Sequence, residues 1–154
     1  MINGYDTYWK WYSQTKLKAL YYELTDTFEQ QVWLYLCKAY KQYNLGERAS
    51  KYVSKEEMIK HLINCGLMHY SEDKKTGERK LPDDRKLREV CRTLLFKGYP
   101  VMASSKHSGW YIADTIEEIR QPKEENEKRA KMILAANKGY NMVAQLIQYD
   151  RRLN

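Results

Sequence analysis

The stretch of sequence that decides the fold is DRKLREVCRTLLFKGYPVMASSKHSGWYIAD, residues 84–114. Its first half carries an apolar set at steps of three and four, the spacing of one face of an α-helix: Leu87, Val90, Cys91, Leu94 and Leu95. Gly98 ends that helix, and two short apolar runs follow at residues 99–103 and 110–113. We therefore predict a helix over residues 83–97 that leads directly into a β-hairpin with a polar tip.

Two further helices are predicted before this stretch. Asp26 and Glu29 form a capping box, and apolar residues then recur at helical spacing to about Tyr43. Ser54 and Glu57 form a second capping box in front of another apolar stripe, which ends at a glycine. The order of elements is therefore three helices followed by a hairpin.

The segments around these elements are less regular. Residues 1–24 are rich in Tyr and Trp without a helical or strand period, and we leave them partly unassigned. Residues 67–82 are polar and broken by glycine and proline, which predicts a long exposed loop. After the hairpin, Asp114 or Thr115 is expected to cap a final helical stretch, in which Thr115 and Glu118 form a third capping box. Pro122 predicts a kink or restart, and a long helix is expected over residues 123–149.

Three helices and a hairpin in this order predict a winged helix-turn-helix. The expected fold class is mainly α with a small β-hairpin and a long C-terminal helix. We divide the chain into an aromatic-rich N-terminal extension (1–24), a winged-helix domain (25–114) and a C-terminal helical segment (115–154).

The charge of the chain is concentrated in the same region. Lys and Arg number 27 against 20 Asp and Glu, a net charge of +7. Between Lys74 and Lys106 there are ten basic and four acidic residues. A local excess of this kind favours a polyanionic partner, because Lys and Arg near phosphates release condensed counterions. The alternative is a solvated basic face without a partner.

Helical geometry divides the predicted third helix into two faces. At about 100° per residue, the side opposite the apolar set carries Arg85, Lys86, Glu89, Arg92 and Thr93, with Arg88 on the flank. A recognition helix presents such a side to the major groove, where Arg pairs with guanine, Thr contacts a thymine methyl and Glu accepts from cytosine. The hairpin tip adds Ser105, Lys106 and His107. Together these nine residues are the predicted nucleic-acid-binding set.

The same residues carry a resemblance to a known family. Asp84-Arg85-Lys86-Leu87-Arg88, Gly98-Tyr99-Pro100-Val101-Met102-Ala103-Ser104-Ser105 and Gly109-Trp110-Tyr111-Ile112-Ala113 resemble, in order, the recognition helix and the two wing strands of small winged-helix proteins from phages and prophages of Gram-positive bacteria. The likeness spans about residues 25–135. It implies a replication-initiation or early-regulator type of protein, with Arg85 and Arg88 as recognition-helix cations and Ser104, Ser105 and Lys106 at the wing tip.

Other classes of function find little support in the sequence. His61, Cys65 and His69 have helical spacing, but a glycine interrupts the helix between the last two, so no metal or other cofactor is expected. No nucleophile-and-base motif suggests an enzyme. Three cysteines in apolar patterns, no secretory signal pattern and no long apolar run predict buried reduced thiols in a cytoplasmic protein without membrane contact. The resemblance implies that this is the cytoplasm of a bacterial host.

The C-terminal helix carries a stripe that alternates steps of three and four: Ala130, Ile133, Asn137, Tyr140, Ala144 and Ile147. These positions fit a and d of a heptad, and a buried Asn at a fixes register in coiled-coil dimers. We predict a homodimer through this stripe. The alternative is that the helix packs back across the helix at residues 26–43.

The predicted function is therefore a phage-type winged-helix protein that binds double-stranded DNA in replication or transcription control. The alternative is a winged-helix interaction factor that inhibits or recruits a host replication or nucleic-acid-processing enzyme. In that alternative the aromatic residues 1–24 and the basic segment meet a protein surface instead of DNA.

Overall fold

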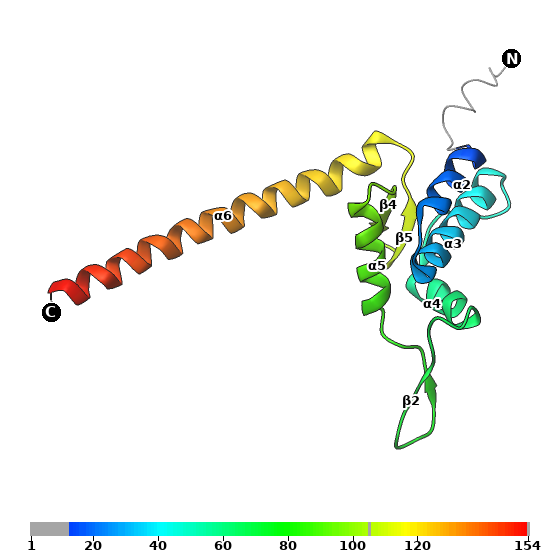
Figure 1. Cartoon of the computed structure of the whole chain (residues 1–154), viewed down its shortest axis with the longest axis horizontal. Coiled ribbons are helices and arrows are strands. Elements are labelled where there is room, and N and C mark those ends of the chain that lie inside the picture. The colour runs from blue at the N-terminus through cyan, green and yellow to red at the C-terminus, as the bar shows by residue number, and fades with distance from the viewer. Residues whose placement is uncertain (1–12, 105, 154) are drawn as a thin grey trace, which may run out of the picture. The chain divides into compact units, whose positions relative to one another are not determined.

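The computed structural model describes residues 13–104 and 106–153 and is mainly helical (Figure 1). Its helices are α2 (Gln14–Glu23), α3 (Thr27–Asn44), α4 (Lys55–Asn64), α5 (Arg85–Phe96) and α6 (Ile116–Leu153). The helices predicted from residues 26–43, 54–65 and 83–97 are thus confirmed as α3, α4 and α5. The chain divides into two compact units, of which the first ends at Asp114 and the second begins at Thr115.

The predicted capping residues Asp26 and Ser54 cap the N-termini of α3 and α4. The Asp26 carboxylate accepts a hydrogen bond from the backbone N–H of Glu29 at 2.9 Å. The Ser54 hydroxyl accepts from the backbone N–H of Glu57 at 3.1 Å. At the start of α5 it is the Asp83 carboxylate that accepts from the backbone of Arg85, at 3.1 Å. Each of these bonds satisfies an amide that the first helical turn leaves without a partner.

A small antiparallel sheet accompanies the helices. Strands β4 (Val101–Ser104) and β5 (Gly109–Ile112) form the predicted hairpin, in which Val101 lies opposite Ile112. A third strand, β1 (Val53–Ser54), pairs with the other edge of β5, so the strand order is β1-β5-β4. Because β5 contacts α3 and β4 contacts α5, the hairpin packs directly against both helices.

The core lies between α3, α4, α5 and the sheet. Its largest fully buried side chains come from all of these elements and include Trp33, Tyr40, Met58, Leu87 and Ile112. Burial of a side chain of this size contributes about 1.5–3 kcal/mol relative to an exposed position. The amphipathic helices therefore fold around one shared apolar interior.

The aromatic-rich segment packs on this core where the structure describes it. Leu17 of α2 is buried, and its backbone C=O accepts a hydrogen bond from the Trp33 indole at 3.2 Å. The Tyr99 hydroxyl donates to the C=O of Leu20 at 2.6 Å. Residues 14–24 therefore belong to the same compact unit as the helices that follow. Residues 1–12 of the predicted extension lie outside the described residues.

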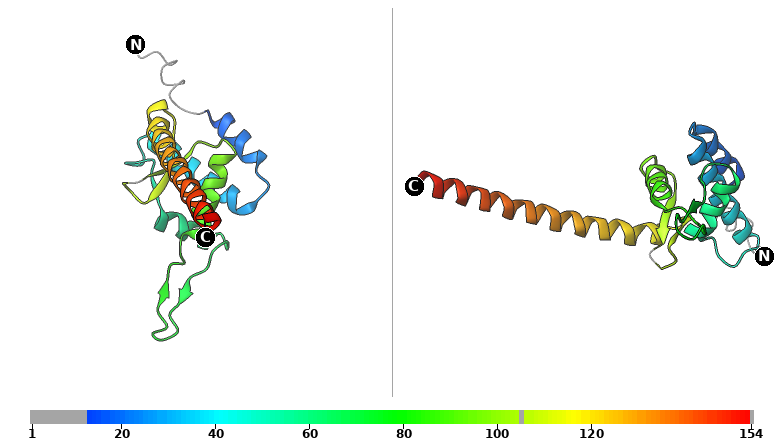
Figure 2. Two further views of the ribbon diagram at one scale, coloured as in Figure 1. Left: turned by 90° about the vertical axis from the view of Figure 1, so that its left-hand side faces the viewer. Right: turned by 90° about the horizontal axis from the view of Figure 1, so that it is seen from below.

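The segment predicted as an exposed loop contains a short two-stranded ribbon instead. Strands β2 (Ser71–Glu72) and β3 (Arg79–Lys80) pair in antiparallel fashion and are exposed on both faces. Gly77, at φ +69°, supplies the left-handed turn, and its N–H donates to the Asp73 C=O at 2.8 Å. Figures 1 and 2 show the ribbon projecting from the end of α5 at which that helix begins.

The C-terminal unit is one helix of 38 residues, which begins directly after the predicted cap at Thr115 and continues through Pro122. The Thr115 hydroxyl accepts from the backbone N–H of Glu118 at 3.3 Å and so caps it. Proline removes only one hydrogen bond here, close to the start of a long helix, and the predicted restart is not observed. Among the described residues, no helix combines the length and the apolar character needed to cross a membrane.

Gly109 allows β5 to approach β1 closely. A Cβ at this position would overlap the Val53 carbonyl group, whose carbon would be 2.8 Å away, and would lie 2.9 Å from the Cα of Ser54. Both obstacles are backbone, which cannot rotate aside. The glycine is therefore required for the pairing of these two strands.

We predict that Gly109→Ala lowers the free energy of unfolding by about 1–3 kcal/mol, because the added methyl group forces the two strands apart. Urea unfolding followed by Trp fluorescence measures this. Lys106→Ala, at the exposed hairpin tip, is the control and should change stability by less than about 0.5 kcal/mol. Equal stability of the Gly109 variant and the wild type would contradict the close approach.

Candidate nucleic-acid interface

Helix α5 has one buried and one exposed face. Leu87, Val90, Cys91 and Leu94 are buried, as predicted. Leu95, predicted to belong to the buried set, is 41% exposed and lies at the edge of a cleft beside the helix. The buried face is therefore narrower than the apolar pattern indicates.

Three of the predicted contact residues lie on the outer side of α5. Arg85, Glu89 and Arg92 are exposed and lie opposite the buried residues at about 100° per residue. Arg85 and Glu89 are within ion-pair distance, 3.8 Å between Nε and Oε1, but both are exposed, so this pair contributes little to stability. Their side chains remain accessible to a partner.

Lys86 and Thr93 lie toward the flank of α5 that faces away from the hairpin. The Lys86 ammonium is 5.5 Å from the centroid of the Phe28 ring on α3. The Thr93 hydroxyl donates to the backbone C=O of Glu89 at 2.9 Å. Lys86 is nevertheless exposed, as Arg85 and Arg92 are, whereas Thr93 is only partly exposed.

A cleft of about 380 Å³ separates the other flank of α5 from the sheet. Arg88 and Arg92, one helical turn apart, line it from α5, and Lys55 lines it from the start of α4. The Arg88 guanidinium is 3.2 Å from the carboxylate of Asp84, which also lines the cleft. The remaining lining residues are Cys91, Leu95, Val101, Ala103, Ser104, Ser108, Gly109 and Trp110.

The cleft thus combines three cations and one carboxylate, that of Asp84, with two hydroxyls over an apolar floor. Neither Arg92 nor Lys55 has an ion-pair partner within the described part of the chain. Unpaired cations beside hydroxyl donors suit a phosphate group, which accepts several charge-assisted hydrogen bonds. Lys55 was absent from the predicted contact set, because no local pattern links α4 to the hairpin. Ser108 was absent as well, and Ser104 was expected at the hairpin tip only from the resemblance.

Two hydrogen bonds hold the tip of the β4–β5 hairpin. The backbone N–H of Lys55 donates to the Ser108 C=O at 3.0 Å, and the His107 N–H donates to the Ser104 hydroxyl at 3.2 Å. Lys106 and His107 are exposed. The His107 ring lies 4.9 Å from that of Tyr52. Ser105, also predicted at the tip, lies outside the described residues.

One cation of the basic segment has a structural role. The Lys97 ammonium is 2.7 Å from the carboxylate of Glu29, which is only 8% exposed. A buried carboxylate is costly unless it is paired. Lys97 therefore neutralises Glu29 and ties the end of α5 to the start of α3.

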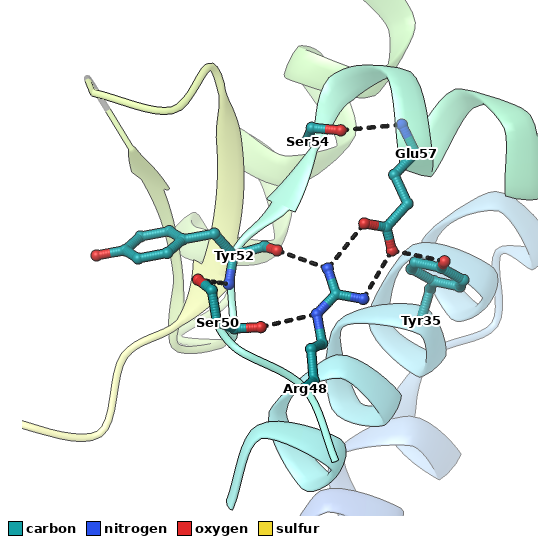
Figure 3. Close-up of polar contacts among 6 residues, drawn as sticks. All are labelled: Tyr35, Arg48, Ser50, Tyr52, Ser54 and Glu57. Carbon is teal, nitrogen blue, oxygen red and sulfur yellow. Dashed lines mark hydrogen bonds and ion pairs between the residues drawn. The ribbon is translucent and has the colours of Figure 1, made fainter. Parts of the chain in front are cut away.

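A half-buried network centred on Arg48 holds the residues that lead into β1 (Figure 3). The Arg48 guanidinium donates twice to the Glu57 carboxylate, at 2.7 and 2.9 Å, and also to the C=O groups of Ser50 and Tyr52, each at 2.7 Å. The Tyr35 hydroxyl donates to Glu57 at 2.7 Å. The network attaches residues 48–52 to α3 and α4, and so places β1 and Lys55.

The same contacts shift the pKa values of the Glu57 and Tyr35 side chains. Hydrogen bonds from Arg48 hold the pKa of the Glu57 carboxyl below its ordinary value. Burial, together with the neighbouring Glu57 carboxylate, raises the pKa of Tyr35 to about 12. At neutral pH the carboxylate is therefore ionised and the phenol protonated, the forms that the network needs.

The cysteines only partly follow the prediction of buried thiols. Cys91 is buried and Cys37 half-buried, and burial raises the pKa of the Cys37 thiol to about 12. Cys65 is exposed, which contradicts the prediction, because it follows the last turn of α4 and lies beside His61, 3.6 Å from Nε2. Among the described residues, no cluster of three or more His, Cys, Asp or Glu side chains could hold a metal ion.

The predicted self-association stripe lies on α6 and is exposed along its whole length. Ile133, Tyr140 and Ile147 are 55%, 71% and 51% exposed. Ala130, Asn137 and Ala144 are exposed as well. The stripe is thus accessible to a second chain.

Comparison with protein-family models, with curated proteins and with solved structures finds no match to this chain.

We predict that Glu57→Gln lowers the free energy of unfolding by about 1–2 kcal/mol at neutral pH, because the charge-assisted bonds to Arg48 are lost. The wild type should itself lose this contribution as the pH falls below about 4.5, the ordinary pKa of the carboxyl, and through the lower folded value. Chemical unfolding between neutral and acidic pH tests both effects. Glu117→Gln, in an exposed pair with Arg120, is the control and should have little effect. An unchanged pH dependence in the Glu57 variant would contradict the network's role.

Proposed function

We propose that this chain is a phage-type winged-helix protein that binds double-stranded DNA in replication or transcription control, in the cytoplasm of a bacterial host. The element order α3-β1-α4-α5-β4-β5 and the strand order β1-β5-β4 support a winged-helix arrangement. In this arrangement α5 is the recognition helix and β4–β5 the wing. The proposed fold thus brings the basic residues of both elements to one side.

The observation that carries the proposal is the position of Arg88, Arg92 and Lys55 around one cleft between α5 and the wing. The exposed Arg85 and Glu89 continue this surface along the helix. Outer-face residues of α5 would read base edges in the major groove, whereas the cleft cations would hold the phosphate backbone beside it. Lys106 and His107 would reach the backbone from the wing.

Self-association through α6, predicted as a homodimer, would bring two or more such surfaces to one DNA molecule. Linked sites bind more tightly than separate ones, because the second contact becomes intramolecular. A single small domain would gain most from this effect, since it covers little DNA alone.

A second candidate function is protein docking with a host replication or nucleic-acid-processing enzyme. Phe96 at the end of α5 is 79% exposed and the neighbouring Leu95 is 41% exposed. Exposed aromatic residues are common at the centres of protein interfaces and contribute little to contacts with a phosphate backbone. This apolar pair is the observation that favours the second candidate.

We predict that the chain binds a mixed-sequence duplex of about 20 base pairs and that the affinity falls steeply between about 50 and 200 mM salt. Arg85→Ala with Arg92→Ala should weaken binding, at a specific site by about 1–3 kcal/mol for each residue. Fluorescence anisotropy measures the affinities. Lys18→Ala with Lys41→Ala, on α2 and α3, removes the same charge and should have a smaller effect. No binding at about 50 mM salt would contradict the DNA function and leave protein docking as the candidate.

The cleft generates a separate prediction. Lys55→Ala should weaken binding to all duplex sequences alike and reduce the slope of log affinity against log salt by about one, as expected for one lost phosphate contact. Lys60→Ala, exposed on the same helix, is the matched control. A salt titration of both variants checks this, and equal slopes for Lys55→Ala and the wild type would remove the cleft from the interface.

A further inference from the structure

The second half of α6 exposes more apolar surface than a single helix in water supports. Between residues 132 and 149, Met132 is 73% exposed, Met142 65% and Leu146 62%, in addition to the residues of the predicted stripe. Isolated helices are only marginally stable in water, and most helical stability in proteins comes from packing of an apolar face. A continuous exposed apolar surface of this kind marks an interaction site.

The apolar residues are not confined to the predicted stripe. At 100° per residue, apolar and small side chains of residues 132–149 fill a continuous arc of about 220°. Tyr149 and Met142 lie at one edge of this arc, Val143 near its centre and Ala144 at the other edge. The remaining strip contains Asn141, Gln145 and Lys138, and it is polar except for Leu134, which lies near its centre.

An arc of this width needs more than one neighbouring helix. A helix that packs one face against a core presents an apolar stripe of about 100° or slightly more. A partner on the predicted stripe would cover Ile133, Tyr140 and Ile147. Met132, Met142 and Leu146, on the other side of the arc, would remain in water. At least two neighbours are therefore required to cover the arc.

Further copies of this chain fit the arc better than other occupants. The exposed large apolar side chains of described residues 13–114 are spread over separate elements, such as Tyr22 on α2, Tyr43 on α3 and Phe96 on α5, and so form no face of matching length. A lipid surface favours helices with a strongly charged polar face. The polar strip within residues 132–149 holds one cation, Lys138, among Asn and Gln side chains.

We propose that residues 132–149 of α6 form the core of a helical bundle built from three or more copies of this chain. Each helix uses the predicted stripe against one neighbour and the side with Met132, Met142 and Leu146 against another. Small residues within the arc, including Ala136 and Gly139, let the helices approach closely. This assembly does not depend on DNA binding, and it extends the predicted homodimer to a higher order.

Sedimentation equilibrium of the full chain tests the bundle. The expected mass is at least three times the 18.5 kDa of one chain. Met142→Lys with Leu146→Lys should reduce it to a dimer or monomer. Asn141→Lys with Gln145→Lys adds the same charge to the polar strip and should leave the mass unchanged. Arg85→Ala with Arg92→Ala should also leave the mass unchanged, so that a loss of DNA binding can be distinguished from a loss of assembly.

A wild-type mass of one or two chains at every concentration would overturn the bundle, whatever the variants do. An equal loss of mass in the Met142→Lys/Leu146→Lys and Asn141→Lys/Gln145→Lys variants would overturn the assignment of the Met142 and Leu146 side to a second neighbouring helix. Lys131 and Arg151 flank the apolar segment and could bind anionic lipids, so sedimentation with lipid vesicles is measured as well. A monomer that sediments with phosphatidylserine-containing vesicles, but not with neutral ones, would assign the arc to a membrane surface instead.

Discussion

The pairing of β1 with β5 is the constraint on which the interface depends. Ser54 lies opposite Gly109 in this pairing, and the backbone N–H of Lys55 donates to Ser108 immediately beside it. The absence of a side chain at Gly109 allows the two strands to approach closely. The wing is thereby held against the start of α4 as well as against α5. Without this pairing, β4–β5 would be a two-stranded hairpin held only by its packing against α3 and α5.

The cleft follows from the same constraint. Arg88 and Arg92 come from α5 and Lys55 from the start of α4, and the packing of both helices against α3 and the sheet brings these residues around one cleft. The Arg48 network fixes residues 48–52 and so sets where β1 begins. A rigid support of this kind reduces the side-chain and loop ordering that binding would otherwise require. Fold stability and the proposed phosphate contacts therefore depend on one set of backbone positions.

The sequence predicted what depends on local pattern and missed what depends on distant pairing. The helical period identified α3, α4 and α5, and most of the buried face of α5, because each repeats every three or four residues. Strand β1 has only two residues and carries no detectable period. The ribbon β2–β3 is exposed on both faces and lacks alternation. Lys55 joins the candidate site through contacts with residues far along the chain, which a local pattern does not report.

The central claim is that α5, the cleft and the wing act as one surface for duplex DNA. Backbone NMR of the full chain during addition of a short duplex at low salt tests it most directly. We expect the amide signals of residues 85–92, of Lys55 and of residues 106–109 to shift together, while those of α2 stay in place. Shifts scattered over the molecule, or confined to α6, would contradict the account.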